Sequence, residues 1–259
     1  MPPRTPLRKV GLARALSKLG YCSRSQAASL IREGRVRLNS VIRRDPEWPV
    51  HLGLIQSGKD RVEIDDAPLA RTASQYWMMN KPRGLVTTAS DERGRATIYS
   101  LLDPAHSWLA PVGRLDQASE GLLLLTNDSE WGQRVLDPVT HLEKTYHVQV
   151  NVVADEALLA KLRHGILENQ ESEGQDRGRL HARRVELLRS GAKNSWLKIV
   201  LDEGKNRQIR RMLSACGVEV LRLVRVAIGP LALGDLAKGK ARELTLEEKK
   251  NLDRALKVT

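Results

Sequence analysis

The chain has 259 residues, a length that predicts one or two domains and allows a substantial buried core. Its formal net charge of +12 is concentrated near the N-terminus, because residues 4 to 44 hold eleven basic side chains and one acid, Glu33. A local excess of this size predicts a polyphosphate partner, whereas a merely soluble basic protein would spread its charge. An anionic membrane surface is the alternative partner, but no long apolar segment or lipidation motif supports it.

Several classes of protein receive no support from the composition. Cys22 and Cys216 occur in different predicted domains and do not indicate a disulfide framework. Residues 1 to 9 lack the apolar core of a secretory signal peptide, so we expect a cytoplasmic location. The closest histidine pair, His141 and His147, has no cysteine or carboxylate at zinc-ligand spacing, and no Walker loop or dinucleotide fingerprint is present. The sequence therefore predicts no metal and no cofactor.

The first predicted elements are two short helices joined by a tight turn. Apolar residues at helical spacing mark the first helix: Leu12, Ala15, Leu16 and Leu19. Gly20 ends this helix. Ser23 and Gln26 have the spacing of a capping box and begin a second helix, which ends at Gly34.

A small sheet is expected next. Residues 35–39 and 61–64 alternate between apolar and polar side chains, so Arg35 and Arg37 project outward from the predicted strands. A generic solvated helical hairpin is the alternative, but much of the basic excess lies on these helices or beside the strand. Arg24, Arg35 and Arg37 are therefore candidate RNA contacts.

This region resembles the RNA-binding domain named after small-subunit ribosomal protein four, over residues 12 to about 69. The signature consists of Leu19-Gly20-Tyr21-Cys22-Ser23-Arg24, the Ala27-Ala28 pair, Ile31, Gly34, Val36 and Asn39. Ser40 departs from the usual glycine, and the segment 43–58 is longer than a simple hairpin turn, which leaves its path open. Residues 70–75 are small and polar, and predict a linker between domains at 10–69 and 76–259.

The second domain is predicted to mix strands and helices. Strand character is found at 77–80, 144–152 and 195–201, and helical spacing at 155–163, 207–216 and 245–256. The elements do not alternate in a strict βαβ repeat, which favours a mainly antiparallel α+β sheet over a doubly wound one. Residues 168–179 are polar, contain glycine and predict a mobile loop.

The motif Arg114-Leu115-Asp116 precedes Glu120-Gly121 and four consecutive leucines at 122–125. The leucines predict a short strand covered on both faces, although periodicity alone does not exclude a buried helix. A rigid strand can aim the Asp116 carboxylate from the loop that enters it. The alternative is a surface ion pair between Arg114 and Asp116.

Four blocks in this order resemble the RsuA-like branch of the pseudouridine synthases, over residues 76 to 247. The blocks are Asn80-Lys81-Pro82-Arg83-Gly84-Leu85-Val86, Gly113-Arg114-Leu115-Asp116, Glu143-Lys144-Thr145-Tyr146 and Glu203-Gly204-Lys205-Asn206-Arg207-Gln208-Ile209-Arg210-Arg211-Met212. They are followed by Leu-x-Arg-x-x-Ile-Gly, which begins at Leu223. The resemblance implies a curved central sheet with helices on its outer side. It also implies an isomerase that breaks the base-to-ribose bond of a uridine, rotates the uracil and rejoins it through a ring carbon.

The resemblance assigns roles to four residues. Asp116 is the catalytic carboxylate, either as a nucleophile or as a base that removes a proton from the sugar. Tyr146 supplies a ring for the flipped uracil, although a strand tyrosine more commonly belongs to the core. Arg210 pairs with Asp116 and keeps it ionised. Leu223 packs under the base.

Other cations are predicted to contact the substrate: Arg114, Lys205, Arg207 and Arg211, with a solvated helix face as the alternative. The chain has no phenylalanine, so we expect base contact to be limited to one flipped nucleotide. From the family resemblance we expect the substrate to be ribosomal RNA rather than transfer RNA. We also expect the protein to be a monomer. Two other readings stay open: a non-catalytic RNA-binding assembly factor, and a glycosidic-bond hydrolase that pairs Asp116 with Glu120.

Overall fold

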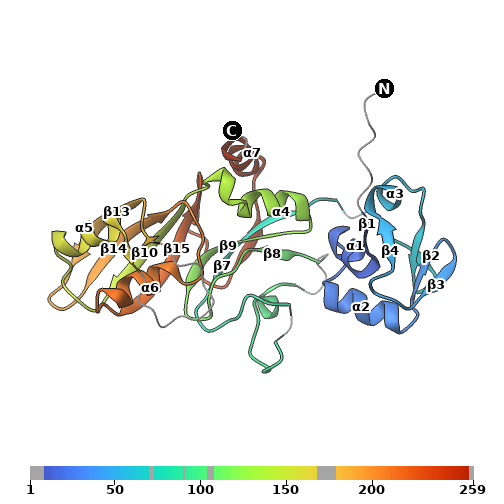
Figure 1. Ribbon diagram of the computed structural model, residues 1–259, viewed down its shortest axis with the longest axis horizontal. Coiled ribbons are helices and arrows are strands. Elements are labelled where there is room, and N and C mark those ends of the chain that lie inside the picture. The colour runs from blue at the N-terminus through green and yellow to red at the C-terminus, as the bar shows by residue number, and fades with distance from the viewer. Residues whose placement is uncertain (1–8, 70–72, 90, 104–107, 168–178, 257–259) are drawn as a thin grey trace. The chain divides into compact units, whose positions relative to one another are not determined.

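The computed structural model of the chain describes residues 9–69, 73–89, 91–103, 108–167 and 179–256 (Figure 1). It forms two compact units, one built mainly from the chain up to Tyr76 and the other from most of the remainder. Residues 70–72 of the predicted linker and residues 168–178 of the predicted loop lie outside the described residues.

The N-terminal unit begins with the two predicted helices, α1 (Leu12–Lys18) and α2 (Arg24–Arg32). The capping box is present, because the Gln26 amide donates to Ser23 Oγ at 3.1 Å and the Ser23 amide donates to Gln26 Oε1 at 3.0 Å. These bonds satisfy amide groups that a helix start otherwise leaves unpaired. The prediction for this helix start is confirmed.

A four-stranded antiparallel sheet, in the order β3-β2-β5-β6, completes this unit. Its strands are β2 (Val36–Leu38), β3 (Val41–Arg43), β5 (Val62–Ile64) and β6 (Ala67–Pro68). Val36 and Leu38 are buried, and they pack with apolar residues of α1 and α2 in one core. The inward and outward directions expected for this strand are confirmed.

The segment 43–58 is more than a hairpin turn. It contains β4 (Pro49–His51), which pairs antiparallel with β1 (Lys9–Gly11), followed by the short helix α3 (Leu52–Gln56). The Arg43 guanidinium lies over the Trp48 ring, 3.9 Å from its centroid. This cation–π contact and the two-stranded pairing define the path of the segment.

The second unit is built on a nine-stranded sheet whose main path, among the described residues, is β13-β14-β10-β15-β9-β7-β17. These strands are β7 (Tyr76–Lys81), β9 (Glu120–Thr126), β10 (Lys144–Val150), β13 (Arg184–Ser190), β14 (Ser195–Leu201), β15 (Val220–Ile228) and β17 (Ala241–Glu243). Two short strands lie off this path, β8 (Ala110–Val112) against β9 and β16 (Leu231–Ala232) against β15. Most pairings are antiparallel, whereas β9 and β15 run parallel. The predicted α+β class is confirmed.

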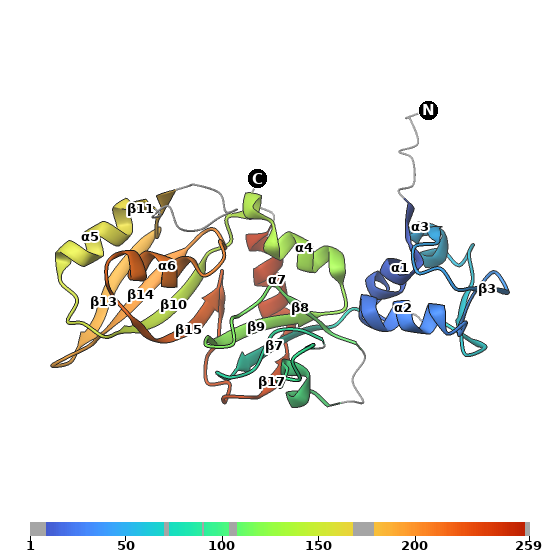
Figure 2. The same cartoon turned by 60° about the horizontal axis from the view of Figure 1, so that its bottom comes forward.

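Helices pack against the sheet of the second unit (Figures 1 and 2). Helices α5 (Glu156–His164) and α6 (Gln208–Ala215) pack on apolar residues of β10, β13, β14 and β15. Helices α4 (Ser129–Leu136) and α7 (Leu246–Ala255) are joined by Trp131, whose Nε1 donates to Asp253 at 3.0 Å. The remaining short elements are η1 (Ile98–Leu101), η2 (Pro138–Thr140), β11 (Ile166–Leu167) and β12 (Arg179–Leu180). None of the described helices combines the length and apolar character needed to cross a membrane.

Strand β9 gives the loop that carries Asp116 a rigid, buried support. All seven of its residues are buried, which confirms the strand predicted from the four leucines. Gly121 has φ of +102°, and a Cβ at this position would lie 2.3 Å from the Arg225 carbonyl oxygen. Only glycine therefore allows β9 to approach β15 this closely.

Candidate active site

A cavity of about 650 Å³ opens beside the sheet in the second unit. Its lining includes most of the predicted site residues of this unit: Arg114, Asp116, Tyr146, Lys205, Arg207 and Leu223. Arg210 and Arg211, on α6, are not part of the lining. Segments that are far apart in the sequence therefore meet at one cavity of a size typical of ligand pockets.

The loop that carries Asp116 is restrained from outside. Thr87 Oγ1 donates to the Leu115 carbonyl oxygen at 2.7 Å and accepts from the Leu115 amide at 3.3 Å. The Gly84 amide donates to the Gln117 carbonyl oxygen at 2.8 Å, and Gln117 Nε2 donates to the Gly84 carbonyl oxygen at 3.0 Å. The segment after β7 thus fixes the backbone on both sides of Asp116.

The buried Lys81 side chain holds the same loop through its backbone carbonyl oxygens. Its side chain is fully buried, and Nζ donates to the carbonyl oxygens of Pro82, Asp116 and Ser119 at 3.1, 3.2 and 3.0 Å. Burial lowers the pKa of Lys81 to about 8, although the carboxylates of Asp116 and Glu120 oppose this shift. The first block of the sequence pattern contains Lys81, but its burial under the loop depends on contacts distant in sequence.

The ion pair at Asp116 differs from the prediction. Arg207 Nη1 lies 3.7 Å from Asp116 Oδ2, whereas Arg210 Nη2 donates to the Ala118 carbonyl oxygen at 3.1 Å. The predicted pair between Arg210 and Asp116 is not among the ion pairs of the described residues. Burial lowers the pKa of Arg210, Arg207 adds to the shift, and Asp116 opposes it, so the carboxylate and both guanidinium groups share one electrostatic environment.

The position of Arg207 follows from the start of α6. Arg207 is the N-cap residue and adopts a left-handed backbone with φ of +48°. The next residue, Gln208, is buried and donates through Nε2 to the His181 carbonyl oxygen and to Glu203 Oε1 at 3.0 and 2.8 Å. Lys205 Nζ lies 3.2 Å from Glu203 Oε2. The buried glutamine therefore anchors the basic segment at the edge of the cavity.

Strands β10 and β15 provide the wall of the cavity. Tyr146 is directly opposite Arg225 in the register, and Leu223 is opposite Val148. Arg225 is buried, and its Nε donates to the Leu122 carbonyl oxygen at 2.7 Å. Arg225 lines the cavity but was not among the predicted site residues, although it lies in the final motif of the sequence.

Lys144 is a second cavity residue that the site prediction did not include. It lies two residues before Tyr146 on β10. Burial lowers its pKa, Arg225 acts in the same direction, and Asp202 opposes the shift. Two neighbouring cations thus lie on the sheet side of the cavity, where an electron-rich base or a phosphate would be attracted.

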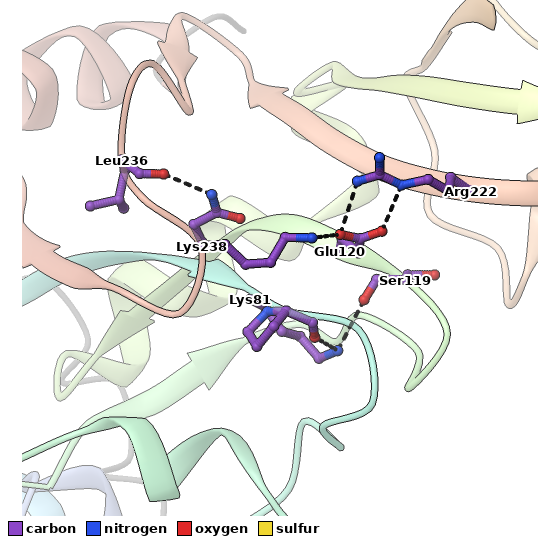
Figure 3. A network of polar contacts seen from close by, with 8 residues as sticks. Lys81, Ser119, Glu120, Arg222, Leu236 and Lys238 are labelled. Atoms are coloured by element: carbon purple, nitrogen blue, oxygen red, sulfur yellow. Dashed lines mark hydrogen bonds and ion pairs between the residues drawn. The ribbon is translucent and has the colours of Figure 1, made fainter.

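Glu120 is not available as a second catalytic carboxylate. It does not line the cavity, and Arg222 and Lys238 both donate to it (Figure 3). Burial by itself raises the pKa of Glu120, but these hydrogen bonds outweigh that effect and hold the pKa below its usual range. A paired-carboxylate glycosidase needs one carboxyl group protonated at neutral pH. The geometry therefore does not support the hydrolase reading.

The predicted RNA-contacting cations of the N-terminal unit have different surroundings. Arg35 makes a two-pronged contact with Asp65 at 2.8 and 2.7 Å, and Arg37 Nε lies 2.9 Å from Asp66. Arg24 is exposed at the start of α2. The two ion pairs are at the surface, where such pairs contribute little stability and can be exchanged for phosphates.

No group of three or more potential metal ligands among histidine, cysteine, aspartate and glutamate occurs in the part of the chain that the structure describes.

Comparison with known proteins identifies the family. The sequence profile of RNA pseudouridylate synthase matches residues 75–215, and that of the S4 domain matches residues 10–55. The chain is 34% identical to ribosomal large subunit pseudouridine synthase B of Bacillus subtilis, over 93% of this chain and 94% of that protein. The chain belongs to the RNA pseudouridylate synthase family.

Further relatives agree with this assignment. An RNA pseudouridine synthase of Aquifex aeolicus, itself uncharacterized, is 36% identical over 96% of this chain and 95% of its own length. A crystal structure of a pseudouridylate synthase superimposes with a TM-score of 0.63 at 31% identity, covering 94% of this chain and 99% of that one. The protein is thus an RNA-modifying isomerase with an RNA-binding S4 domain, as the two resemblances implied. The roles of its individual residues stay predictions.

Proposed function

We propose that this synthase converts a specific uridine of ribosomal RNA to pseudouridine, with Asp116 as the catalytic carboxylate. The observation that carries the proposal is the position of Asp116. Its side chain is 37% exposed, lines the cavity and belongs to a loop that is restrained on both sides. A fixed, accessible anion beside the sugar is the main demand of a reaction that breaks and remakes a bond to the ribose.

The other cavity residues fit defined tasks. Asp116 either attacks the sugar or base covalently or removes a proton from the ribose. Tyr146 offers a flat ring to a uracil that has left its stack, and Leu223 offers an apolar contact beneath it. Arg207 restrains the orientation of the Asp116 carboxylate, and Arg210 restrains the loop through the Ala118 carbonyl oxygen.

Ribosomal RNA is the proposed substrate, in preference to transfer RNA. The Bacillus subtilis relative is named for the large ribosomal subunit, and residues 4–44, which include both long helices of the S4 domain, have a formal charge of +10 (eleven basic side chains less Glu33) out of +12 for the chain. Arg24, Arg35, Arg37, Arg114, Lys205 and Arg211 are the proposed phosphate contacts. The proposal includes a cytoplasmic monomer with an RNA-binding domain at 10–69, a linker at 70–75 and a catalytic domain at 76–259.

The test compares Asp116→Asn with the wild type on ribosomal RNA fragments. Pseudouridine would be mapped after incubation with each enzyme, and the dissociation constant for the same RNA would be measured in parallel. We expect loss of product with an RNA affinity within a few-fold of wild type. Asp235→Asn, an exposed position outside the cavity, is the matched control. Normal turnover by Asp116→Asn would reject the assignment of the carboxylate.

A further inference from the structure

Glu120 is one of the few buried charged residues described in this chain. Its side chain is 5% exposed and accepts hydrogen bonds from Arg222 Nε and Nη2 at 3.1 and 3.2 Å and from Lys238 Nζ at 2.5 Å. The two cations are themselves 43% and 55% exposed. We refer to these three residues as the Glu120 clamp.

The clamp joins the start of β9 to two segments that lie more than 100 residues later in the chain (Figure 3). Glu120 begins β9, Arg222 lies on β15, and Lys238 follows β16. The segment that carries Lys238 is also tied to β7, because Asn80 Nδ2 donates to the Leu236 carbonyl oxygen at 2.7 Å. The carboxylate therefore lies where these parts of the catalytic unit converge.

Only the loop 117–119 separates the clamp from Asp116. The Ser119 amide donates to the Asp116 carbonyl oxygen at 2.9 Å, and the carbonyl oxygens at the two ends of this turn, those of Asp116 and Ser119, accept from Lys81. Lys81 thus holds the turn through its backbone, while Glu120 holds the residue that follows the turn through its side chain. A shift of Glu120 would be transmitted to Asp116 through a short and already constrained turn.

Stability alone does not account for a buried charge at this position. Replacing a buried ion pair by apolar side chains of similar volume is often neutral or stabilising for a fold, because the charges must be desolvated. Val224 is the register partner of Glu120 on β15, and β9 continues through Gly121 into four buried leucines. We therefore look for the role of the Glu120 carboxylate in the position that it gives to neighbouring residues.

We propose that Glu120 is a positioning residue, which uses the Arg222 and Lys238 contacts to fix the start of β9 and thereby the Asp116 carboxylate. The inference rests on the proposed role of Asp116. Glu120 does not touch the substrate, and it acts by limiting the positions that the catalytic loop can adopt. An enzyme without the clamp binds RNA normally but reaches the reactive geometry less often.

The test uses Glu120→Gln, which keeps the shape of the side chain and removes its charge. Because a misplacement of about 1 Å can cost on the order of 100-fold in rate, we expect the single-turnover rate at saturating RNA to fall roughly 10- to 100-fold. The dissociation constant for RNA should stay within about twofold. Glu120→Asp, which retains the charge on a shorter stem, should recover part of the rate. Lys240→Gln removes an exposed charge from the Lys238 segment without touching Glu120, and is the matched control.

Arg222→Gln breaks the clamp at a partly exposed residue, so it provides a second test if the buried Glu120 variants do not fold. We expect a smaller loss for this variant, and for Glu120→Gln combined with Arg222→Gln a loss no greater than that of Glu120→Gln alone, because both changes break one interaction. Rates would be normalised to the folded fraction at the assay temperature. A wild-type rate for folded Glu120→Gln, or strictly multiplicative losses in the double variant, would overturn the positioning role. Full activity of Asp116→Asn would instead reject the proposed function on which it rests.

Discussion

The Lys81 ammonium lies beneath Asp116 and donates to its carbonyl oxygen at 3.2 Å, while the Asp116 carboxylate lies 3.7 Å from Arg207 on the cavity side. The same residue is therefore held through its backbone by one cation and through its side chain by another. Lys81 has three carbonyl acceptors, which use all three of its N–H donors. Its protonation state should determine how firmly the loop is held.

We predict that the single-turnover rate falls as the pH rises through about 8, where the buried Lys81 loses its proton. A neutral amine has only two N–H donors and a lone pair, which faces a carbonyl oxygen, so the turn at Asp116 loosens. Lys81→Met should be slower than wild type by about tenfold or more and should lack this inflection. Rates measured between pH 6.5 and 9.5 on one RNA hairpin test the prediction, and an identical fall in both proteins would contradict it.

The effect of Lys81 on stability has the opposite sign. Its pKa in the folded protein, about 8, lies below the ordinary value of 10.5, so the unfolded chain binds more protons between these two pH values. The cost of burying the charged lysine is fully present below pH 8 and is relieved as the pH rises towards 10.5. Loss of activity above pH 8 should therefore occur without a contribution of Lys81 to unfolding.

Arg207 and Arg210 should differ in their effects on the rate. Arg207 is 52% exposed and its contact with Asp116 is long, so Arg207→Met should cost no more than about fivefold, the equivalent of an exposed ion pair of about 1 kcal/mol. Arg210→Met should cost more, because this partly buried guanidinium also holds the Ala118 carbonyl oxygen. Arg210→Lys should fall between, since lysine keeps the charge but not the forked geometry. Single-turnover rates of the three variants test this order. A larger rate loss for Arg207→Met than for Arg210→Met would show that Arg207 is the more important of the two arginines.

Gly121→Ala should destabilise the catalytic unit by about 2–4 kcal/mol, because the new Cβ would meet the backbone of Arg225 and the backbone at this position has positive φ. Gly204→Ala is the control, since no atom lies within 4 Å of a Cβ built there. Urea denaturation followed by tryptophan fluorescence measures the difference. Equal midpoints for the two variants would show that β9 and β15 separate easily.

Neutralising two exposed cations of the S4 domain, Arg14→Gln with Arg24→Gln, should flatten the salt dependence of RNA binding. Each lost phosphate contact removes roughly 0.7 to 0.9 from the slope of log affinity against log salt, so the expected change is about 1.5. The rate at saturating RNA should be unaffected. The same number of charges removed at Lys193 and Lys250, which are exposed in the catalytic unit, provides the comparison. An unaltered slope for the S4 variant would mean that these helices do not contact RNA.

Local signals were sufficient for much of the fold. The capping box at Ser23 gave the start of α2, and the four leucines gave the buried strand β9, because both patterns are read within a few residues. The segment 195–201 was predicted with the same bounds as β14. The pairing of β1 with β4 was not foreseen, since it joins residues about 40 positions apart through a short pattern with no strong alternation.

The site was predicted less completely, for a physical reason. Motif order placed Asp116, Tyr146 and Leu223 at one cavity, but it could not show which arginine reaches the carboxylate. That outcome depends on the left-handed cap at Arg207, a conformation that is uncommon for a side chain of this size. The partners of Glu120 could not be predicted either, because they lie about 100 residues away and become its neighbours only when the sheet forms.

The parallel pairing of β9 with β15 also sets an order of events during synthesis. The core of the N-terminal unit uses residues from the first quarter of the chain, so this unit can fold while translation continues. The loop with Asp116 must instead wait for Arg225, about 100 residues later, before its strand gains this neighbour. A nascent chain would thus be able to associate with RNA several seconds before it can modify it, since synthesis proceeds at roughly 5–20 residues per second.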